Sequence, residues 1–103
     1  MAQDMRLNEN QIRSIRKIVH ELAGQEARVY LFGSRLIDEK KGGDVDLLIE
    51  LRGSIDQPAV LAARLSARIS RALDGRQVDI VLKAPNLKYL PIHEVALKEG
   101  HPL

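Results

Sequence analysis

The sequence predicts an α/β (α+β) protein in which helices pack on a small mixed β-sheet, in the order α-β-α-β-α-β-α. Two observations predict this class. Apolar residues recur every three or four positions in several stretches, which is the period of an amphipathic helix. Between these stretches lie short runs of β-branched and other apolar residues, which are typical of strands. Because each apolar stripe must be buried against a second layer, we expect the helices to cover the sheet.

The first half of the chain predicts a helix, a strand and a short second helix. Asn8 is a good helix cap, and apolar residues at helical spacing follow it until Gly24 ends the helix. The run 29–32 predicts a strand that ends at Gly33, where the chain must turn sharply or approach a ligand closely. Residues 35–41 have room for one or two helical turns.

The second half predicts two further pairs of strand and helix. We expect a strand over 44–51, then a helix that opens near Pro58 and ends at Asp74 and Gly75. Its apolar residues repeat every four positions: Leu61, Leu65, Ile69 and Leu73. A third strand is expected over 78–82, and a terminal helix near Gly100 is indicated by three apolar residues: Ile92, Val95 and Ala96.

Length and composition exclude several classes of protein. With 103 residues, we expect a single domain over 1–103, and 45% hydrophobic with 29% charged residues is typical of soluble globular proteins. The chain has no Cys, which excludes thiolate sites and disulfides and favours a cytoplasmic location. No apolar run approaches the ~20 residues that span a bilayer. The net charge of +2 is too small to predict nucleic-acid binding.

Three acids interrupt the predicted strands, namely Asp44, Asp46 and Asp79. Side chains alternate along a strand, so Asp44 and Asp46 should point to one face about 7 Å apart. If the third strand lies beside the second, Asp79 joins them. Such a cluster repels itself without a cation, and hard oxygen ligands favour Mg²⁺. Two ions held ~4 Å apart suit phosphoryl or nucleotidyl transfer, so we predict these three residues as metal ligands.

A phosphate-binding turn is predicted directly after the first strand. Gly33 allows the backbone to approach a phosphate, and the hydroxyl of Ser34 can donate to its oxygens. Arg35 could supply positive charge to a triphosphate. Two further residues, Gly42 and Gly43, leave two interpretations open: a flexible turn alone, or a place where nucleotide approaches the acidic strand.

Taken together, these motifs resemble a known family. The string Leu31-Phe32-Gly33-Ser34, then nine residues, then Asp44-Val45-Asp46-Leu47, and later Val78-Asp79-Ile80, is similar to the signature of the DNA polymerase β-like nucleotidyltransferases. Within that superfamily the chain most resembles the minimal nucleotidyltransferases, called MNT proteins. The resemblance runs from about residue 29 to residue 82.

The resemblance implies a fold, a reaction and a partner. It implies the polymerase β-like fold and an MNT antitoxin beside a helical HEPN-type toxin, with AMP transferred from ATP to a hydroxyl of that partner. Gly33 and Ser34 would hold the triphosphate, and Asp44 and Asp46 the metals. Asp79 would help to bind the catalytic metal and activate the acceptor hydroxyl. The alternative is an antitoxin that acts by binding its HEPN partner without catalysis.

Other charged residues have simpler explanations. A helix stripe of Arg64, Arg68 and Arg71 is expected to be solvated, with a grip on RNA or an acidic partner as the alternative. We expect Glu50 to be solvated and outside the site. The three histidines, His20, His93 and His101, show no metal-ligand spacing and are predicted on the surface. A homo-oligomer also remains open, because a chain of this size must find acceptor specificity in a partner or a second copy.

Overall fold

The computed structural model describes residues 7–32 and 45–103. Its elements are α1 (Glu9–Ala23), β1 (Arg28–Phe32), β2 (Val45–Glu50), α2 (Pro58–Ala72), β3 (Val78–Lys83), α3 (Pro91–Glu99) and β4 (His101–Pro102). The predicted α/β (α+β) class is confirmed, and the described elements follow the predicted order. β4 was not predicted, because two residues are too few to form a pattern. The short helix expected over 35–41 lies outside the described residues.

Helix α1 begins and ends where the sequence predicts. The Asn8 side chain accepts the Gln11 N–H at 2.8 Å, while the Gln11 side chain accepts the Asn8 N–H at 2.9 Å. This reciprocal pair is a capping box, which satisfies two backbone donors that a helix start leaves open. Gly24 has φ 104°, in the region that favours glycine, and its N–H donates to the His20 carbonyl at 3.1 Å. The helix therefore stops there.

Helix α2 follows its apolar repeat. Pro58 occupies the first turn, where its missing N–H is not needed. Leu65, Ile69 and Leu73 have no exposed surface, so the predicted apolar stripe is the buried one. The turn after the helix uses Asp74 at φ 62° and Gly75 at φ 86°, two residue types that tolerate the left-handed region.

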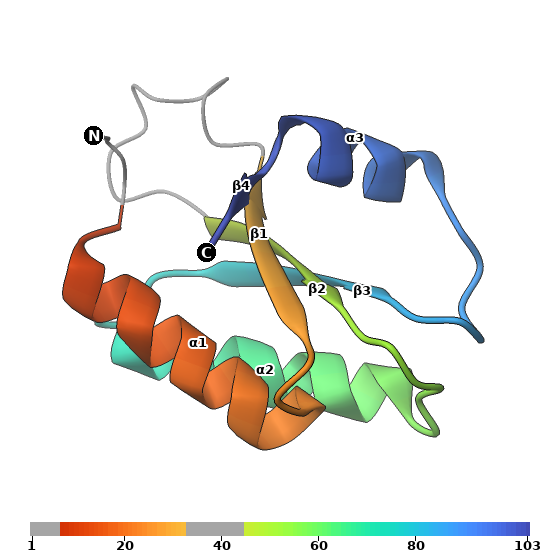
Figure 1. Cartoon of the computed structure of the whole chain (residues 1–103). Coiled ribbons are helices and arrows are strands. Elements are labelled where there is room, and N and C mark those ends of the chain that lie inside the picture. The colour runs from red at the N-terminus through yellow and green to blue at the C-terminus, as the bar shows by residue number, and fades with distance from the viewer. Residues whose placement is uncertain (1–6, 33–44) are drawn as a thin grey trace.

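The four described strands form one mixed sheet in the order β3-β2-β1-β4 (Figure 1). β1 is antiparallel to both of its neighbours, β2 and β4. β2 and β3 are parallel, and α2 supplies the crossover that a parallel pair requires. β2 and β3, which are distant in the sequence, therefore start at the same end of the sheet.

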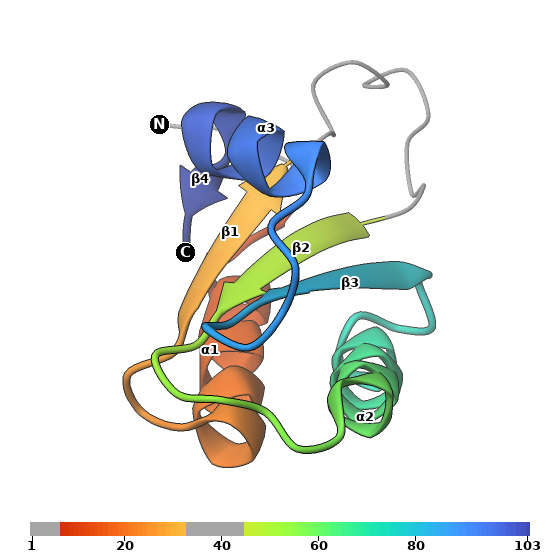
Figure 2. The same ribbon diagram turned by 90° about the vertical axis from the view of Figure 1, so that its right-hand side faces the viewer.

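Helices cover both faces of the sheet. Figure 2 shows α1 and α2 on one face and α3 alone on the other. The odd-numbered residues of β2 are fully buried in the larger core with α1 and α2: Val45, Leu47 and Ile49. Leu48 faces the other way and forms a smaller core with Phe32 and Ala96. The larger core fixes the sheet on its helices, and the smaller one positions α3.

The outer edge of β3 is partly closed by side chains. The carbonyls of Gln77 and Lys83 accept N–H groups from Val45 and Leu51, so these two residues turn their backbone groups toward β2. Successive residues of a strand direct their N–H and C=O groups to alternate sides. The backbone groups of Val78 and Leu82 therefore point to the outer edge of the sheet. The Ser66 hydroxyl donates to the Val78 carbonyl at 2.7 Å, and Nε2 of His93 lies 2.8 Å from the Leu82 carbonyl oxygen. Bonded carbonyls make an edge strand a poorer template for another strand.

The prediction that His93 lies on the surface is wrong: its residue is only 3% exposed. Its Nδ1 accepts the Leu90 N–H at 2.8 Å, so Nε2 carries the proton and donates to the Leu82 carbonyl. The Tyr89 ring stacks on it with 5.3 Å between ring centroids. The imidazole is buried because it ties the first turn of α3 to β3. Of the other two histidines, His101 is exposed and His20 is half-buried.

None of the helices described in this structure is long and apolar enough to cross a membrane.

Candidate functional site

Side chains on the α3 face of the sheet form three rows across β1, β2 and β3. The register places Phe32, Asp46 and Asp79 in the first row, which we call the acidic row. The second, apolar row contains Tyr30, Leu48 and Val81. The third, charged row contains Arg28, Glu50 and Lys83. Adjacent rows are two residues apart along each strand, or about 7 Å.

The acidic row brings together two of the three predicted acids. Asp46 and Asp79 are register partners on parallel strands, and strands of a sheet lie about 4.8 Å apart. Both are the second residue of their strand, so they lie at the shared starting end of β2 and β3. Asp46 is half-buried and Asp79 is exposed, so a ligand can approach from the solvent side of Asp79.

Four predicted site residues lie outside the described residues: Gly33, Ser34, Arg35 and Asp44. The described part of the site nevertheless adjoins them in the chain. β1 ends at Phe32, which is opposite Asp46, and Gly33 is the next residue. Asp44 precedes Val45, the first residue of β2. Their roles, and those of Gly42 and Gly43, stay predictions.

The two described carboxylates fit a hard divalent cation. Mg²⁺ prefers oxygen ligands and commonly takes one or two protein carboxylates, with phosphate and water completing its shell. Within 7–32 and 45–103, no group of three His, Cys, Asp or Glu side chains is arranged to hold a metal. Asp46 and Asp79 would therefore need a further ligand, a role the sequence assigns to Asp44.

Helix α3 packs on Leu48 of the apolar row and on Phe32 at the β1 end of the acidic row, while Asp79 of that row stays exposed. Ala96 and Leu48 have no exposed surface and Phe32 is 8% exposed, so the helix packs closely on the sheet. The sequence predicted this helix from Ile92, Val95 and Ala96, of which only Ala96 faces the sheet. Ile92 and Val95 point outward, at 40% and 46% exposure. A nine-residue helix is too short for its period to decide which flank is buried.

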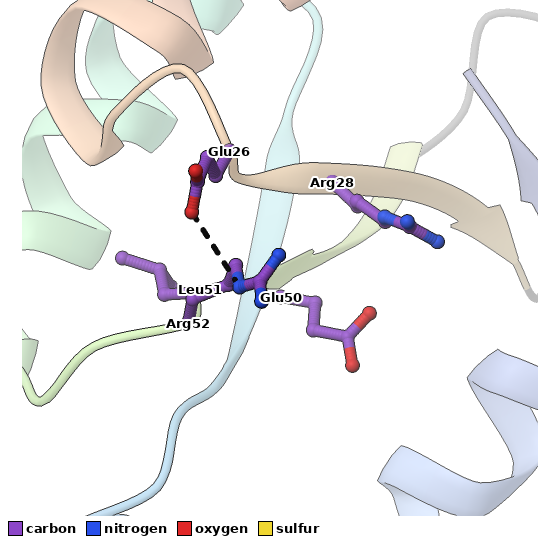
Figure 3. Close-up of a pocket in the computed structure, with 5 residues that line it drawn as sticks. All are labelled: Glu26, Arg28, Glu50, Leu51 and Arg52. Carbon is purple, nitrogen blue, oxygen red and sulfur yellow. Dashed lines mark ion pairs between the residues drawn. The ribbon is translucent and has the colours of Figure 1, made fainter.

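Two residues of the charged row, Arg28 and Glu50, line a separate pocket of about 300 Å³. Figure 3 shows Glu26 and Arg52 pointing toward one another across it, with 3.5 Å between the paired atoms. The charged row lies two rows from Asp46, so the pocket is distinct from the acidic row.

Glu50 differs from its prediction in detail. Its side chain is 30% exposed rather than fully solvated, and its carboxylate lies 3.4 Å from Nζ of Lys83. The two residues are register partners on parallel strands, so the pair follows from the strand alignment. Sequence reasoning could have found this pair by extending the register of Asp46 and Asp79 by four residues. The finding keeps Glu50 outside the acidic row.

The arginine stripe of α2 is exposed, as expected. Arg68 forms an ion pair with Glu21 of α1 at 2.7 Å, which links the two helices. Arg64 and Arg71 are exposed on the same helix. Helix α2, which carries the stripe, lies on the sheet face opposite α3 (Figure 2), so the stripe does not contribute to the acidic row on the α3 face.

The comparison with protein families shows the class of protein to which this fold belongs. Residues 12–100 match the model of the nucleotidyltransferase domain. The chain therefore belongs to the nucleotidyltransferase domain family and is a nucleotidyltransferase. This confirms the predicted enzyme class. The comparison with curated proteins gives no match.

Three solved structures with the same fold are toxin–antitoxin structures. A chain of a toxin–antitoxin with AMP-PNP has 23% sequence identity and a TM-score of 0.68, with 93% of this chain and 72% of that chain covered. A chain of a mutant MntA-HpeT toxin–antitoxin has 24% identity and a TM-score of 0.66, covering 94% and 71%. The toxin–antitoxin MntA-HepT gives 19% and 0.67, covering 92% and 70%. At these identities the similarity shows a shared fold, which agrees with the resemblance to MNT proteins.

Proposed function

We propose that this nucleotidyltransferase moves AMP from ATP to a hydroxyl of a partner protein, as the antitoxin of a toxin–antitoxin pair. The observation that carries the proposal is the register of Asp46 with Asp79, which gathers two carboxylates at one end of the sheet. The structural neighbours support the setting, since they are toxin–antitoxin structures and one contains AMP-PNP. A HEPN-type helical protein is the expected partner.

In the proposed reaction, the acceptor oxygen attacks the α-phosphorus of ATP. A new bond forms between that oxygen and phosphorus, the bond from the α-phosphorus to the bridging oxygen breaks, and pyrophosphate leaves. The hydroxyl proton must pass to a base, and Asp79 is the proposed base because it is exposed beside Asp46. Gly33, Ser34 and Arg35 are the proposed triphosphate ligands.

Asp44, Asp46 and Asp79 would hold Mg²⁺, two ions in the full proposal. When bound, the cation would neutralise charge on the phosphate oxygens and on the leaving group. The protein's own contribution is to hold the carboxylates on one rigid sheet face. Asp46 is well suited to this, because both of its neighbours in β2, Val45 and Leu47, are completely buried.

The test is transfer of label from α-³²P-ATP with MgCl₂ to the protein encoded by the reading frame beside this chain's gene. We expect the partner to carry one AMP when wild-type chain is present. Asp46→Asn and Asp79→Asn should each reduce the initial rate by roughly a hundredfold or more. Asp56→Asn is the matched control, because Asp56 is an exposed acid away from the acidic row. Undiminished labelling by both row variants would remove the proposed role of the acids.

A second candidate function is an antitoxin that neutralises its partner by binding alone. The exposed apolar side chains of α3 favour a protein contact whether or not transfer occurs. The two functions separate in cells that express the toxin. If Asp46→Asn still binds the partner but no longer protects the cells, the chemistry is required. If it protects as wild type does, binding suffices.

A further inference from the structure

Most of the well-exposed large apolar side chains in residues 7–32 and 45–103 come from one short segment. Among the described residues, five large apolar side chains are well exposed, and four of them fall within seven consecutive positions. We call these four the α3 patch: Tyr89, Leu90, Ile92 and Val95, at 54%, 45%, 40% and 46% exposure. Exposed apolar side chains gathered in one segment favour a contact site, whereas scattered exposed residues need no explanation.

The α3 patch is held rigidly in place from behind. Tyr89 stacks on the buried His93 ring, and Nζ of Lys83 lies 5.7 Å from the Tyr89 ring centroid. Ala96, on the inner side of the same helix, has no exposed surface. A partner would therefore meet a preorganised surface, which lowers the entropy that docking costs.

The patch belongs to the same face of the sheet as Asp46 and Asp79. α3 is the helix on that face (Figure 2), and its Ala96 packs with Leu48 of the apolar row and with Phe32, the register partner of Asp46. A protein that presents a hydroxyl to the acidic row must approach across this face, and its surface would meet α3 as it does so. The side chains that it would meet there are the apolar ones of the patch.

The size of the patch argues against a second copy of this chain as the occupant. Stable interfaces bury about 800 Å² per partner and use roughly 20 to 30 residues a side. Four side chains supply only a small part of that, and a symmetric contact through them alone would be weak. A larger partner that also covers the acidic row would extend the interface beyond the patch.

We infer that the α3 patch docks an apolar helix face of the acceptor protein and so aligns the acceptor hydroxyl with Asp46 and Asp79. This inference rests on the proposed function and names where its acceptor binds. The expected partner surface is apolar at its centre, with polar groups that face Lys88, Glu94 and Lys98 at the rim of the patch.

Two valines offer a matched test. Val95 in the patch and Val60 on α2 are both 46% exposed and both helical, but α2 lies on the opposite face of the sheet. Val95→Glu should weaken binding of the protein from the adjacent reading frame by roughly tenfold or more, measured by calorimetric titration. Val60→Glu should bind as wild type does. Both variants should keep the wild-type thermal shift with AMP-PNP and MgCl₂. Val95→Ser, a milder change, serves if Val95→Glu unfolds.

The same measurements separate this inference from the proposed function. If Val95→Glu binds the partner and labels it as wild type does, the docking surface is wrong and the transfer stands. If the wild-type complex forms, depends on Val95 and shows no label, docking stands and transfer falls. Two results would overturn the docking inference: no complex with wild-type chain, or a dimer of the isolated chain that Val95→Glu dissociates in sedimentation experiments.

Discussion

Asp46 and Asp79 lie side by side on one sheet face, as register partners on two parallel strands that start at the same end of the sheet. The alignment depends on buried neighbours rather than on the acids themselves. Val45 is the register partner of Val78, and the two valines are 0% and 4% exposed in the larger core. Since a slip of one residue would turn every side chain to the other face, burial of the valines fixes the position of the carboxylates.

Magnesium should stabilise the wild-type chain through this pair. Like charges on neighbouring strands repel each other, and a bound cation removes that repulsion. We expect the melting temperature to rise with MgCl₂ and AMP-PNP relative to EDTA, because a ligand of the folded state adds about 2.7 kcal/mol at a hundred times its Kd. Asp79→Asn should lose most of this rise, while Asp56→Asn should keep it. Scanning calorimetry measures both, and an equal rise in Asp79→Asn would contradict the metal site.

Replacement of His93 should destabilise the protein more than replacement of an exposed histidine, because the His93 ring is buried. His93→Ala removes two hydrogen bonds of 2.8 Å and leaves the Leu90 N–H and the Leu82 carbonyl without that partner. We expect the free energy of unfolding to fall by about 2 to 4 kcal/mol, as judged by urea denaturation. The matched control is His101→Ala, since His101 is exposed and its loss should cost under about 0.5 kcal/mol. Equal effects would show that the buried ring is not stabilising.

Gly100 should not tolerate a side chain, although its backbone is in an ordinary extended conformation. A Cβ there would press on the Ala96 carbonyl oxygen and also meet the Leu31 carbonyl oxygen, because the end of α3 lies against β1. Gly100→Ala should therefore lower the midpoint of urea unfolding, by an amount equivalent to roughly 1 to 3 kcal/mol. Gly53→Ala is the control, since a Cβ at Gly53 meets no atom within 4 Å. A Gly100→Ala chain as stable as Gly53→Ala would disprove this close approach.

Much of the fold could be predicted because local patterns and tertiary packing agree. Asn8, Gly24 and the Asp74-Gly75 pair mark helix ends through their own backbone chemistry, which needs no distant contact. Alternation along the strand turns Asp46 away from its neighbours Val45 and Leu47, and the structure has those two neighbours buried in the larger core. Parity along one strand was therefore enough to orient the acid.

The failures share a cause, which is that they depend on contacts distant in sequence. His93 is buried because α3 crosses to the outer edge of β3, and no spacing of histidines reports that. β4 forms because His101 and Pro102, which follow α3, pair with β1, with Tyr30 opposite Pro102. The outward position of Ile92 and Val95 reflects which side of α3 meets Leu48. Only the assembled sheet decides these three points.

The hydrogen bond from His93 to the Leu82 carbonyl also affects how partly folded chains associate, because it holds α3 on the sheet. If α3 detached while the rest of the molecule stayed folded, the Leu82 carbonyl would lose its hydrogen bond from His93. The apolar side chains beneath Ala96, Phe32 and Leu48, would be exposed at the same time. Such a species could add strands from other molecules. The nine-residue helix α3 therefore protects the sheet edge from intermolecular strand pairing, and its detachment should promote aggregation.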